Sequence, residues 1–269
     1  MERVRAVVAG AGGRMGQRIV AALDGQAGIA LAGAFERAGH PGLGCDAGVA
    51  AGTRATGVVI EEGIERVLPA GDVLIDFTAP EASLRHVEAA LRLDKAVVLG
   101  TTGMDAAQLA ALEKASRKIP IVFAPNMSVG VNLLFKVLAD VAAVLGDAYD
   151  VEIVEAHHRF KKDAPSGTAK KMAQVIAETL RRDLDKVAVP GRSGMVGERK
   201  PEEIGILAVR GGDIVGDHTV IFAGLGERVE ITHRAHSRDT FARGAVRAAG
   251  WVVGRVPGLY DMMDVLGLK

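Results

Sequence analysis

The chain of 269 residues is poor in cysteine, in net charge and in long apolar runs. Its single cysteine, Cys45, cannot form an internal disulfide, which is typical of a reducing compartment, and no cluster of cysteine and histidine surrounds it to hold a metal. Lys+Arg and Asp+Glu both number 33, and this zero net charge argues against broad binding to nucleic acid or anionic membrane. The apolar runs stop well short of the ~20 residues that a spanning helix needs, and the N-terminus shows no secretory signal. We therefore expect a soluble, cytoplasmic protein with no metal, nucleic-acid or membrane partner.

A glycine-rich turn follows the first predicted strand. Residues 4–9 predict a buried strand, and Ile19, Val20 and Leu23 mark the helix beyond the turn Gly10-Ala11-Gly12-Gly13-Arg14-Met15-Gly16. Strand, turn and helix in this order are the context of a dinucleotide fingerprint, whose glycines let backbone N–H groups approach a pyrophosphate. The last glycine comes one residue later than in G-x-G-x-x-G, so the turn alone is a weak indication.

The end of the next predicted strand, residues 29–35, supports this interpretation. Glu36-Arg37 follows that strand about 20 residues beyond the turn, where an acidic residue can bind the adenosine ribose hydroxyls. The adjacent arginine can meet a 2′-phosphate. Because both residues are present, the choice between NADH and NADPH stays open.

Strands and amphipathic helices then alternate as far as residue 123, which predicts a Rossmann-type parallel sheet with helices on both faces. In such a sheet, ligands bind beyond the carboxyl ends of the strands. Polar turns lie at each of these ends, and we expect them to line one crevice: Gly10–Met15, Glu36-Arg37, Phe77-Thr78, Gly100–Thr102 and Ala124–Met127.

The pattern changes after Met127. A long apolar helix over 131–145 is followed by predicted strands at 151–155, 204–209, 219–222 and 228–233, and the later ones are too close together for helical crossovers. We therefore predict a second, α+β domain with a mixed or antiparallel sheet. A final helix over 241–253 should return to the first domain. The predicted bounds are 1–128 with 238–269 for the dinucleotide-binding domain, and 129–237 for a substrate-binding and oligomerisation domain.

The densest group of ionisable residues follows the strand at 151–155. His157 and His158 are adjacent, Lys161 lies close behind them, and Ser166-Gly167-Thr168 opens a helix whose free N–H groups favour an anion. A polar loop with an ordinary N-cap is the alternative explanation.

A nucleotide crevice together with such a cluster suggests hydride transfer with proton assistance. A histidine near its reference pKa of about 6.5 can act as a general acid at neutral pH. Because adjacent strand residues point to opposite faces, His157 and His158 should have different tasks. Lys161 suits an acid or a carboxylate partner, and the Gly167-Thr168 N–H groups suit a carboxylate, so we expect an acidic substrate.

Several of these segments together resemble the dihydrodipicolinate reductase family, along nearly the whole chain. The resemblance rests on the following segments: Gly10–Gly16, Asp76-Phe77-Thr78, Gly100–Gly103, Asn126–Asn132, Glu155–His158 with Lys161–Thr168, and Gly212–His218. The segment from the paired histidines to Gly167-Thr168 is highly specific, whereas the glycine turn is not.

The resemblance implies reduction of a small cyclic dicarboxylic imine, formed by loss of water from 4-hydroxy-tetrahydrodipicolinate, in lysine and diaminopimelate biosynthesis. The hydride comes from C4 of NADH or NADPH. His157 is implied as proton donor and acceptor, Lys161 as the second proton donor, and His158, Gly167 and Thr168 as substrate-carboxylate contacts. Which of His157 and Lys161 delivers the decisive proton stays open. A homotetramer is also implied. The implied coenzyme contacts are Gly10, Ala11, Gly12, Gly13, Arg14, Met15, Glu36, Arg37, Gly100, Thr101, Thr102, Ala124, Pro125, Asn126 and Met127.

Two other functions compete with this one. Lys161 could form a Schiff base in a lyase, although such a lysine prefers a desolvated pocket and its neighbours here are charged. Alternatively, the chain could be a dinucleotide-sensing regulator whose second domain only dimerises. Retention of His157, Lys161 and Gly167-Thr168 together is hard to explain in a regulator.

Overall fold

The computed structural model describes residues 3–269, which form two units. The first unit runs to Val129 and resumes over Arg238–Lys269, and the second is Gly130–Ser237. The chain therefore leaves the first unit and returns to it, as the last predicted helix suggests.

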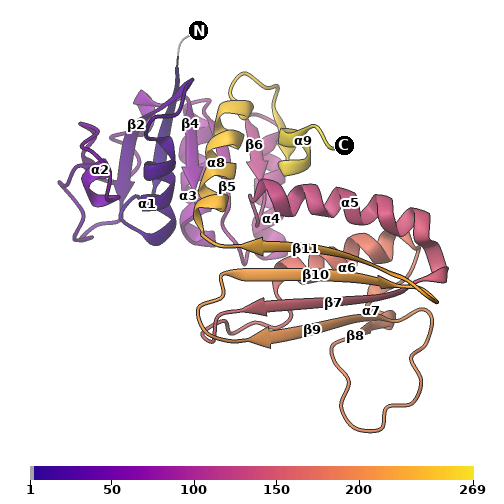
Figure 1. The fold of residues 1–269 in the computed structure, drawn as a ribbon. Coiled ribbons are helices and arrows are strands. Elements are labelled where there is room, and N and C mark those ends of the chain that lie inside the picture. The colour runs from indigo at the N-terminus through magenta and orange to yellow at the C-terminus, as the bar shows by residue number, and fades with distance from the viewer. Residues whose placement is uncertain (1–2) are drawn as a thin grey trace. The chain divides into compact units, whose positions relative to one another are not determined.

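The first unit is built on a parallel sheet (Figure 1). Within the described residues its strands are β1 (Val4–Ala9), β2 (Ile29–Glu36), β3 (Ile60–Glu62), β4 (Val73–Asp76), β5 (Ala96–Leu99), β6 (Pro120–Phe123) and β12 (Gly258–Tyr260), in the order β12-β6-β5-β4-β1-β2-β3. Read from β3 to β6, this is the Rossmann strand order, and it reverses direction between β1 and β4. The predicted fold class is confirmed, and the reversal marks where a ligand should bind.

Helices cover both faces of this sheet because its strands are apolar on both sides. Ala6 and Val8 of β1 pack in the same core as α1 (Arg14–Leu23), α8 (Asp239–Val252) and α9 (Met262–Leu266). Val7 and Ala9 point the other way, into the core formed with α3 (Pro80–Arg92) and α4 (Ala106–Ser116). The return of α8 therefore completes one face of the first sheet.

The helix starts follow the local sequence. Pro80 occupies the first turn of α3, where its missing N–H costs nothing. Asp105 and Gln108 form a capping box at the start of α4: the Gln108 N–H donates to Asp105 Oδ1 at 2.8 Å, and the Asp105 N–H donates to Gln108 Oε1 at 2.9 Å.

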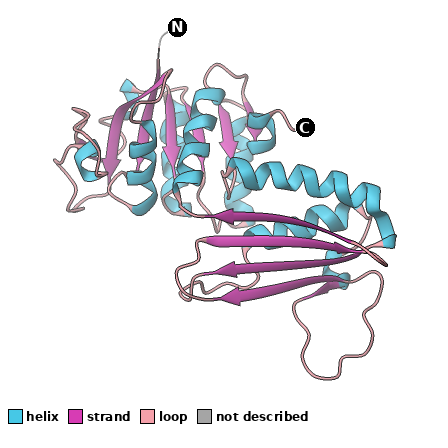
Figure 2. Ribbon diagram, in the orientation of Figure 1, coloured by secondary structure: helices cyan, strands magenta, loops and turns pink. Residues whose placement is uncertain are grey.

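The second unit carries a mixed sheet, also confirmed (Figure 2). Its strands β7 (Asp150–His157), β8 (Ala188–Val189), β9 (Ile204–Arg210), β10 (Gly216–Ala223) and β11 (Arg228–Ala235) lie in the order β11-β10-β7-β9-β8. β7 pairs parallel with β9 and antiparallel with β10. Although β9 and β10 are close in the sequence, they do not pair with each other, because β7 lies between them and pairs with both.

One face of this sheet packs on α5 (Val129–Leu145) and α6 (Gly167–Thr179), which share a core with Val151, Ile153 and Val220. By length and composition alone, α5 with the turn η2 (Gly146–Ala148) could cross a bilayer. Leu134, Leu138 and Ala142 are instead buried in the core, and on the exposed side Lys136 Nζ pairs with Asp140 Oδ1 at 2.7 Å. This pattern is typical of the core helix of a folded unit.

Several short elements lie in the connections between the longer ones. Between β2 and β3 lies α2 (Ala47–Ala50), whose first turn is capped by Asp46. Beyond residue 180, α7 (Leu184–Val187) leads directly into β8, and η1 (Leu68–Ala70) precedes β4. Cys45 is exposed in the first of these connections.

Candidate active site

A pocket of about 540 Å³ opens where the strand order of the first sheet reverses. Turns after β1, β2 and β4 contribute to it, together with the start of α3. Its lining residues are Gly10, Gly13, Arg14, Met15, Gly16, Phe35, Glu36, Arg37, Gly63, Phe77, Thr78, Ala79, Ala82, Arg85 and His86. Three of the five polar turns expected at one crevice therefore meet in this pocket.

The glycine-rich turn packs against the start of α1 without room for side chains. A Cβ on Gly16 would overlap the Gly10 carbonyl and the Ala11 Cα, and Gly10 itself has a φ of +62°, which favours glycine. Gly13 precedes α1 and, within the described chain, no side chain caps the helix there. The first N–H groups of α1 and the positive end of its dipole are thus available to an anion.

Glu36 is buried at the end of β2 and faces this turn. Its Oε1 accepts the Gly12 N–H at 3.1 Å and its Oε2 accepts the Arg37 N–H at 3.2 Å. His40 packs against the Gly12 Cα, with its Nε2 3.9 Å from Glu36 Oε1. The carboxylate thus joins the end of β2 to the turn, and Arg37 lies exposed beside it.

A buried polar network links the ends of β4 and β5. Asp76 Oδ1 accepts the Thr78 N–H at 2.8 Å and its hydroxyl at 2.7 Å, while His86 Nδ1 lies 2.7 Å from Asp76 Oδ2. Ser83 Oγ lies 3.3 Å from Thr78 Oγ1 and 2.7 Å from Thr101 Oγ1. The turn after β5 is therefore fixed to the turn after β4.

The other two predicted turns do not line the pocket. A Cβ on Gly100 would overlap the ring of Phe77, a residue that lines the pocket, whereas Gly100 itself does not line it. Beyond β6, Asn126 Oδ1 accepts the Ser128 N–H at 2.9 Å, and Met127 is fully buried in the core.

In the second unit, β7 alternates between half-buried and buried residues and ends at His157. Glu155 and His157 face the helix-covered side, in register with Ala208 and Arg210 of β9. His158 follows the strand, so the two histidines differ in environment: His157 is buried, whereas His158 is half-buried with a buried Nδ1 that has no partner within the described chain.

Glu155 is a fully buried carboxylate that accepts four hydrogen bonds. Oε2 lies 2.7 Å from both His157 Nδ1 and Arg210 Nη1, and Oε1 accepts Arg210 Nη2 at 2.8 Å and the Ser166 N–H at 2.9 Å. Burial by itself raises the pKa of Glu155, but the donors from Arg210, His157 and Ser166 outweigh it and the pKa falls below its ordinary value. Burial lowers the pKa of His157, and the Glu155 carboxylate opposes that effect.

A second buried histidine lies beside His157. The His218 ring on β10 meets the His157 ring edge-on at 5.2 Å, and its Nε2 lies 3.0 Å from the Ser166 hydroxyl, which also caps α6 by accepting the Ala169 N–H. Burial lowers the pKa of His218 to about 4, so it is neutral at physiological pH.

Lys161 and the start of α6 complete the cluster. Lys161 Nζ donates to Asp163 Oδ1 at 2.9 Å, and this pair holds the pKa of Asp163 below its ordinary value. The Lys161 N–H bonds the His158 carbonyl at 3.0 Å, which makes the loop a tight turn. Gly167 and Thr168 are the first residues of α6, and no atom lies near the position of a Cβ on Gly167. The space beside Gly167 is therefore open to a ligand.

Comparison with known proteins decides the family. The model of the dihydrodipicolinate reductase N-terminus matches residues 4–127, and that of the C-terminus matches residues 130–266. The chain belongs to the dihydrodipicolinate reductase family.

Named relatives are similar over their full length. The chain is 57% identical over 266 residues to 4-hydroxy-tetrahydrodipicolinate reductase from Syntrophotalea carbinolica, covering 99% of this chain and 100% of the relative. It is 58% identical over 262 residues to the enzyme of that name from Geobacter sulfurreducens, covering 97% and 98%. A dihydrodipicolinate reductase from Paenisporosarcina sp. TG-14, solved with dipicolinate bound, shares the fold with a TM-score of 0.74 at 24% identity, covering 97% of this chain and 98% of that one.

Within this reductase, sequence reasoning missed several residues that the structure places at the two clusters. Arg85 and His86 reach the first pocket from α3, and Arg210 and His218 reach Glu155 and His157 from other strands. The Gly212–His218 segment carried part of the family resemblance, but no local pattern indicated that its histidine packs on His157.

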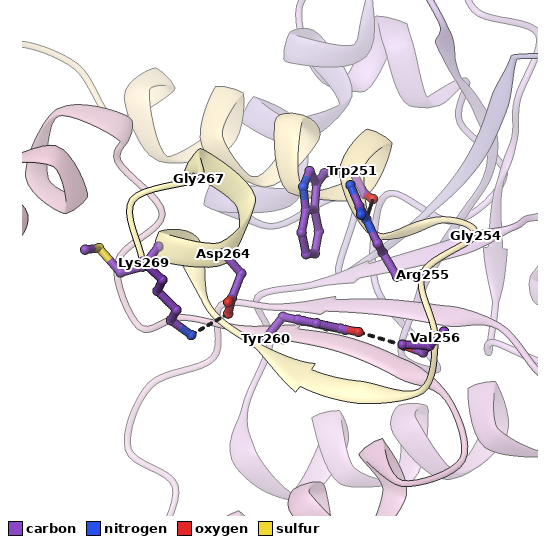
Figure 3. Close-up of a pocket in the computed structure, with 9 residues that line it drawn as sticks. Trp251, Gly254, Arg255, Val256, Tyr260, Asp264, Gly267 and Lys269 are labelled. Atoms are coloured by element: carbon purple, nitrogen blue, oxygen red, sulfur yellow. Dashed lines mark hydrogen bonds and ion pairs between the residues drawn. The ribbon is translucent and has the colours of Figure 1, made fainter.

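The reductase has a second cavity, of about 390 Å³, near its C-terminal segment (Figure 3). The Arg255 guanidinium lies 4.3 Å from the Trp251 ring centroid, Tyr260 donates to the Val256 carbonyl at 3.0 Å, and Lys269 Nζ pairs with Asp264 at 2.6 Å. These polar side chains of the cavity wall therefore interact with neighbouring residues of the same wall. The residues predicted for the active site do not line this cavity. Among residues 3–269, no group of three or more His, Cys, Asp or Glu side chains is placed to hold a metal ion.

Proposed function

We propose that the chain is a 4-hydroxy-tetrahydrodipicolinate reductase of lysine and diaminopimelate biosynthesis. It is an oxidoreductase that uses NADH or NADPH to convert 4-hydroxy-tetrahydrodipicolinate to tetrahydrodipicolinate and water. The observation that carries this proposal is the 57% identity, over essentially the whole of both chains, to a reductase of that name. A cytoplasmic location fits a biosynthetic enzyme with one cysteine.

The first unit fits a dinucleotide by its own features. The start of α1 has free N–H groups, Gly16 allows close packing, and the pocket is lined by three arginines and one glutamate. Gly10–Met15 would hold the pyrophosphate, and Glu36 and Arg37 the adenosine ribose. The turns Gly100–Thr102 and Ala124–Met127 would contact the rest of the coenzyme. When bound, the reduced nicotinamide supplies the hydride.

The second unit supplies carboxylate binding and protons. The N–H groups of Gly167 and Thr168 at the start of α6, with His158, would bind the substrate carboxylates, because a helix N-terminus favours anions. His157 would exchange the proton through Nε2, because Nδ1 is held by Glu155. Lys161, positioned by Asp163, would be the second proton donor.

The direct test is an assay of the purified chain with substrate generated in situ from pyruvate and aspartate semialdehyde. We expect substrate-dependent oxidation of the reduced coenzyme, followed as loss of nicotinamide absorbance, with NADH and NADPH measured in parallel. Omission of pyruvate is the control. Absence of substrate-dependent oxidation with both coenzymes would contradict the proposal.

Arg85 adds a testable element of coenzyme choice. It lines the same pocket as Arg37, and the 2′-phosphate found only in NADPH is the group that a second guanidinium would bind. We expect Arg85→Gln to raise the KM for NADPH about tenfold and the KM for NADH less than about twofold. Arg92→Gln, in the last turn of the same helix and outside the pocket, is the matched control. An equal loss with both coenzymes would exclude a 2′-phosphate contact.

The open face of the second sheet supports a homotetramer. Val154, Leu207 and Ile221 on this face are only half-buried, and Val209 is 48% exposed. Such a face is typical of a surface that packs against another copy.

We expect light scattering to give a mass four times the 28.0 kDa of one chain, and we expect Leu207→Glu to lower the measured mass. Leu225→Glu, in the exposed turn after β10, should leave the mass unchanged; a monomeric wild-type chain would refute the tetramer.

A further inference from the structure

The Glu155 carboxylate has no room for another donor. Each oxygen already accepts two hydrogen bonds, which is close to the capacity of a carboxylate, and the side chain is fully buried. Two of the four bonds come from one guanidinium in a bidentate pair, the strongest and most directional form of this interaction. The orientation of Glu155 is therefore set by β9 and by the start of α6, whatever His157 does.

This fixed acceptor determines the state of the His157 ring. An ionised carboxylate can only accept, so the proton in the 2.7 Å contact belongs to Nδ1 of His157. When the imidazole is neutral, Nε2 is then the nitrogen without a proton. Space is kept beside Nε2 by Gly216, because a Cβ at that position would lie 3.0 Å from it. Gly216 has no positive φ, so this glycine provides space rather than an unusual backbone conformation.

We propose that Glu155, held by Arg210 and the Ser166 N–H, is a positioning residue that fixes the ring orientation and the Nδ1 proton of His157, so that proton exchange occurs only at Nε2. This inference rests on the proposed role of His157 and adds residues from β9 and β10 to it. Neither Arg210 nor Gly216 touches the reacting atoms in this scheme. Arg210 acts through Glu155, and Gly216 acts by leaving Nε2 accessible.

Four charged or titratable groups face His157 from the elements packed around it: Glu155 on β7, Arg210 on β9, His218 on β10 and Lys161 in the following loop. Glu155 stabilises the imidazolium, whereas Arg210 and Lys161 disfavour it. Because His218 is neutral, its edge contact adds desolvation but no charge. Loss of Glu155 and loss of Arg210 should therefore change the titration of His157 in opposite directions.

The test follows the His157 Cε1 signal by NMR in the full-length chain labelled with ¹³C-histidine, assigned by its loss in His157→Gln. We expect Glu155→Gln to move the titration midpoint of His157 down by about one pH unit or more, and Arg210→Gln to move it up. With Glu155→Gln, kcat should fall at least about tenfold while KM for the coenzyme is unchanged. Midpoint shifts in the same direction for both variants would overturn the proposal, since general loosening of the site has no reason to produce opposite signs.

Glu152→Gln is the matched control. It lies on the same strand but on the opposite face, where it pairs with Arg192 and Arg199, and it should leave the His157 midpoint in place. If Glu155→Gln fails to fold, Gly216→Ala tests the same idea: kcat should fall while the His157 midpoint is preserved, because Nε2 is crowded and Glu155 is intact. Full activity of Gly216→Ala would then refute the assignment of Nε2.

The two levels of the proposal can be separated. If His157→Gln retains turnover, the role of His157 itself fails. If His157→Gln loses turnover but the Glu155 and Arg210 variants leave the midpoint unchanged, only the positioning role fails.

Discussion

Replacement of His157 by glutamine is expected to lower kcat by at least about 100-fold while NADPH binds with unchanged affinity. General acid–base groups typically contribute 10²- to 10⁴-fold, and glutamine keeps a hydrogen-bond donor toward Glu155 but cannot exchange a proton at neutral pH. Coenzyme affinity should be preserved because His157 belongs to the second unit, whereas the dinucleotide pocket is lined entirely by residues of the first. Stopped-flow reduction and fluorescence titration of NADPH measure the two quantities separately.

His233→Gln is the control for this prediction. His233 lies opposite His218 across β10 and β11 and is also partly desolvated, which lowers its pKa, but no hydrogen bond joins it to Glu155 within the described chain. It should keep most of the activity. If His157→Gln retains more than about a tenth of the wild-type kcat, proton exchange must be assigned elsewhere, and Lys161→Gln then becomes the decisive variant. The hypothesis of a dinucleotide-sensing regulator would be supported only if the wild-type chain also showed no turnover.

The parts of the fold that were predicted correctly depend on local physics. Continuous apolar strands such as β4 and β5 are buried on both faces. Residues that favour helix starts, such as Pro80 and Asp105, mark the first turns of α3 and α4. The short elements β3, α2, α7, β8, β12 and α9 were missed or shifted. Elements of two to five residues carry too few positions for any periodicity, and their stability comes from the neighbours on which they pack.

The site was predictable to the extent that its residues are neighbours in the sequence. His157, Lys161 and the start of α6 lie within one short segment, and the structure does gather them. Arg210 reaches Glu155 across 55 residues, and His218 reaches Ser166 across 52, and these contacts depend on β7 lying between β9 and β10. That strand order is decided by non-local pairing, and the sequence alone predicted a mixed or antiparallel sheet without a strand order. Arg85 was missed for the same reason, since it shares a pocket with Glu36 only through the non-local pairing of β1, β2 and β4.

Gly16→Ala is expected to weaken coenzyme binding at least about tenfold and to lower the free energy of unfolding by about 1–3 kcal/mol. The added methyl would overlap the Gly10 carbonyl and the Ala11 Cα, and these are backbone atoms, so no side chain can rotate to make room. The turn and the start of α1 must separate, which displaces the N–H groups proposed for the pyrophosphate. Isothermal titration with NADPH and urea unfolding followed by circular dichroism measure the two effects.

Gly250→Ala, also a glycine-to-alanine change in the first unit, is expected to raise the free energy of unfolding instead of lowering it. Gly250 lies on an exposed position of α8 with no atom within contact of the added methyl, so alanine should stabilise the chain by about 0.5–1 kcal/mol through its higher helix propensity. Coenzyme affinity should not change. Wild-type NADPH affinity in Gly16→Ala would mean that the glycine turn does not hold the pyrophosphate. The last glycine of the turn, one position late for the usual fingerprint, would then serve only the packing of α1 on β1.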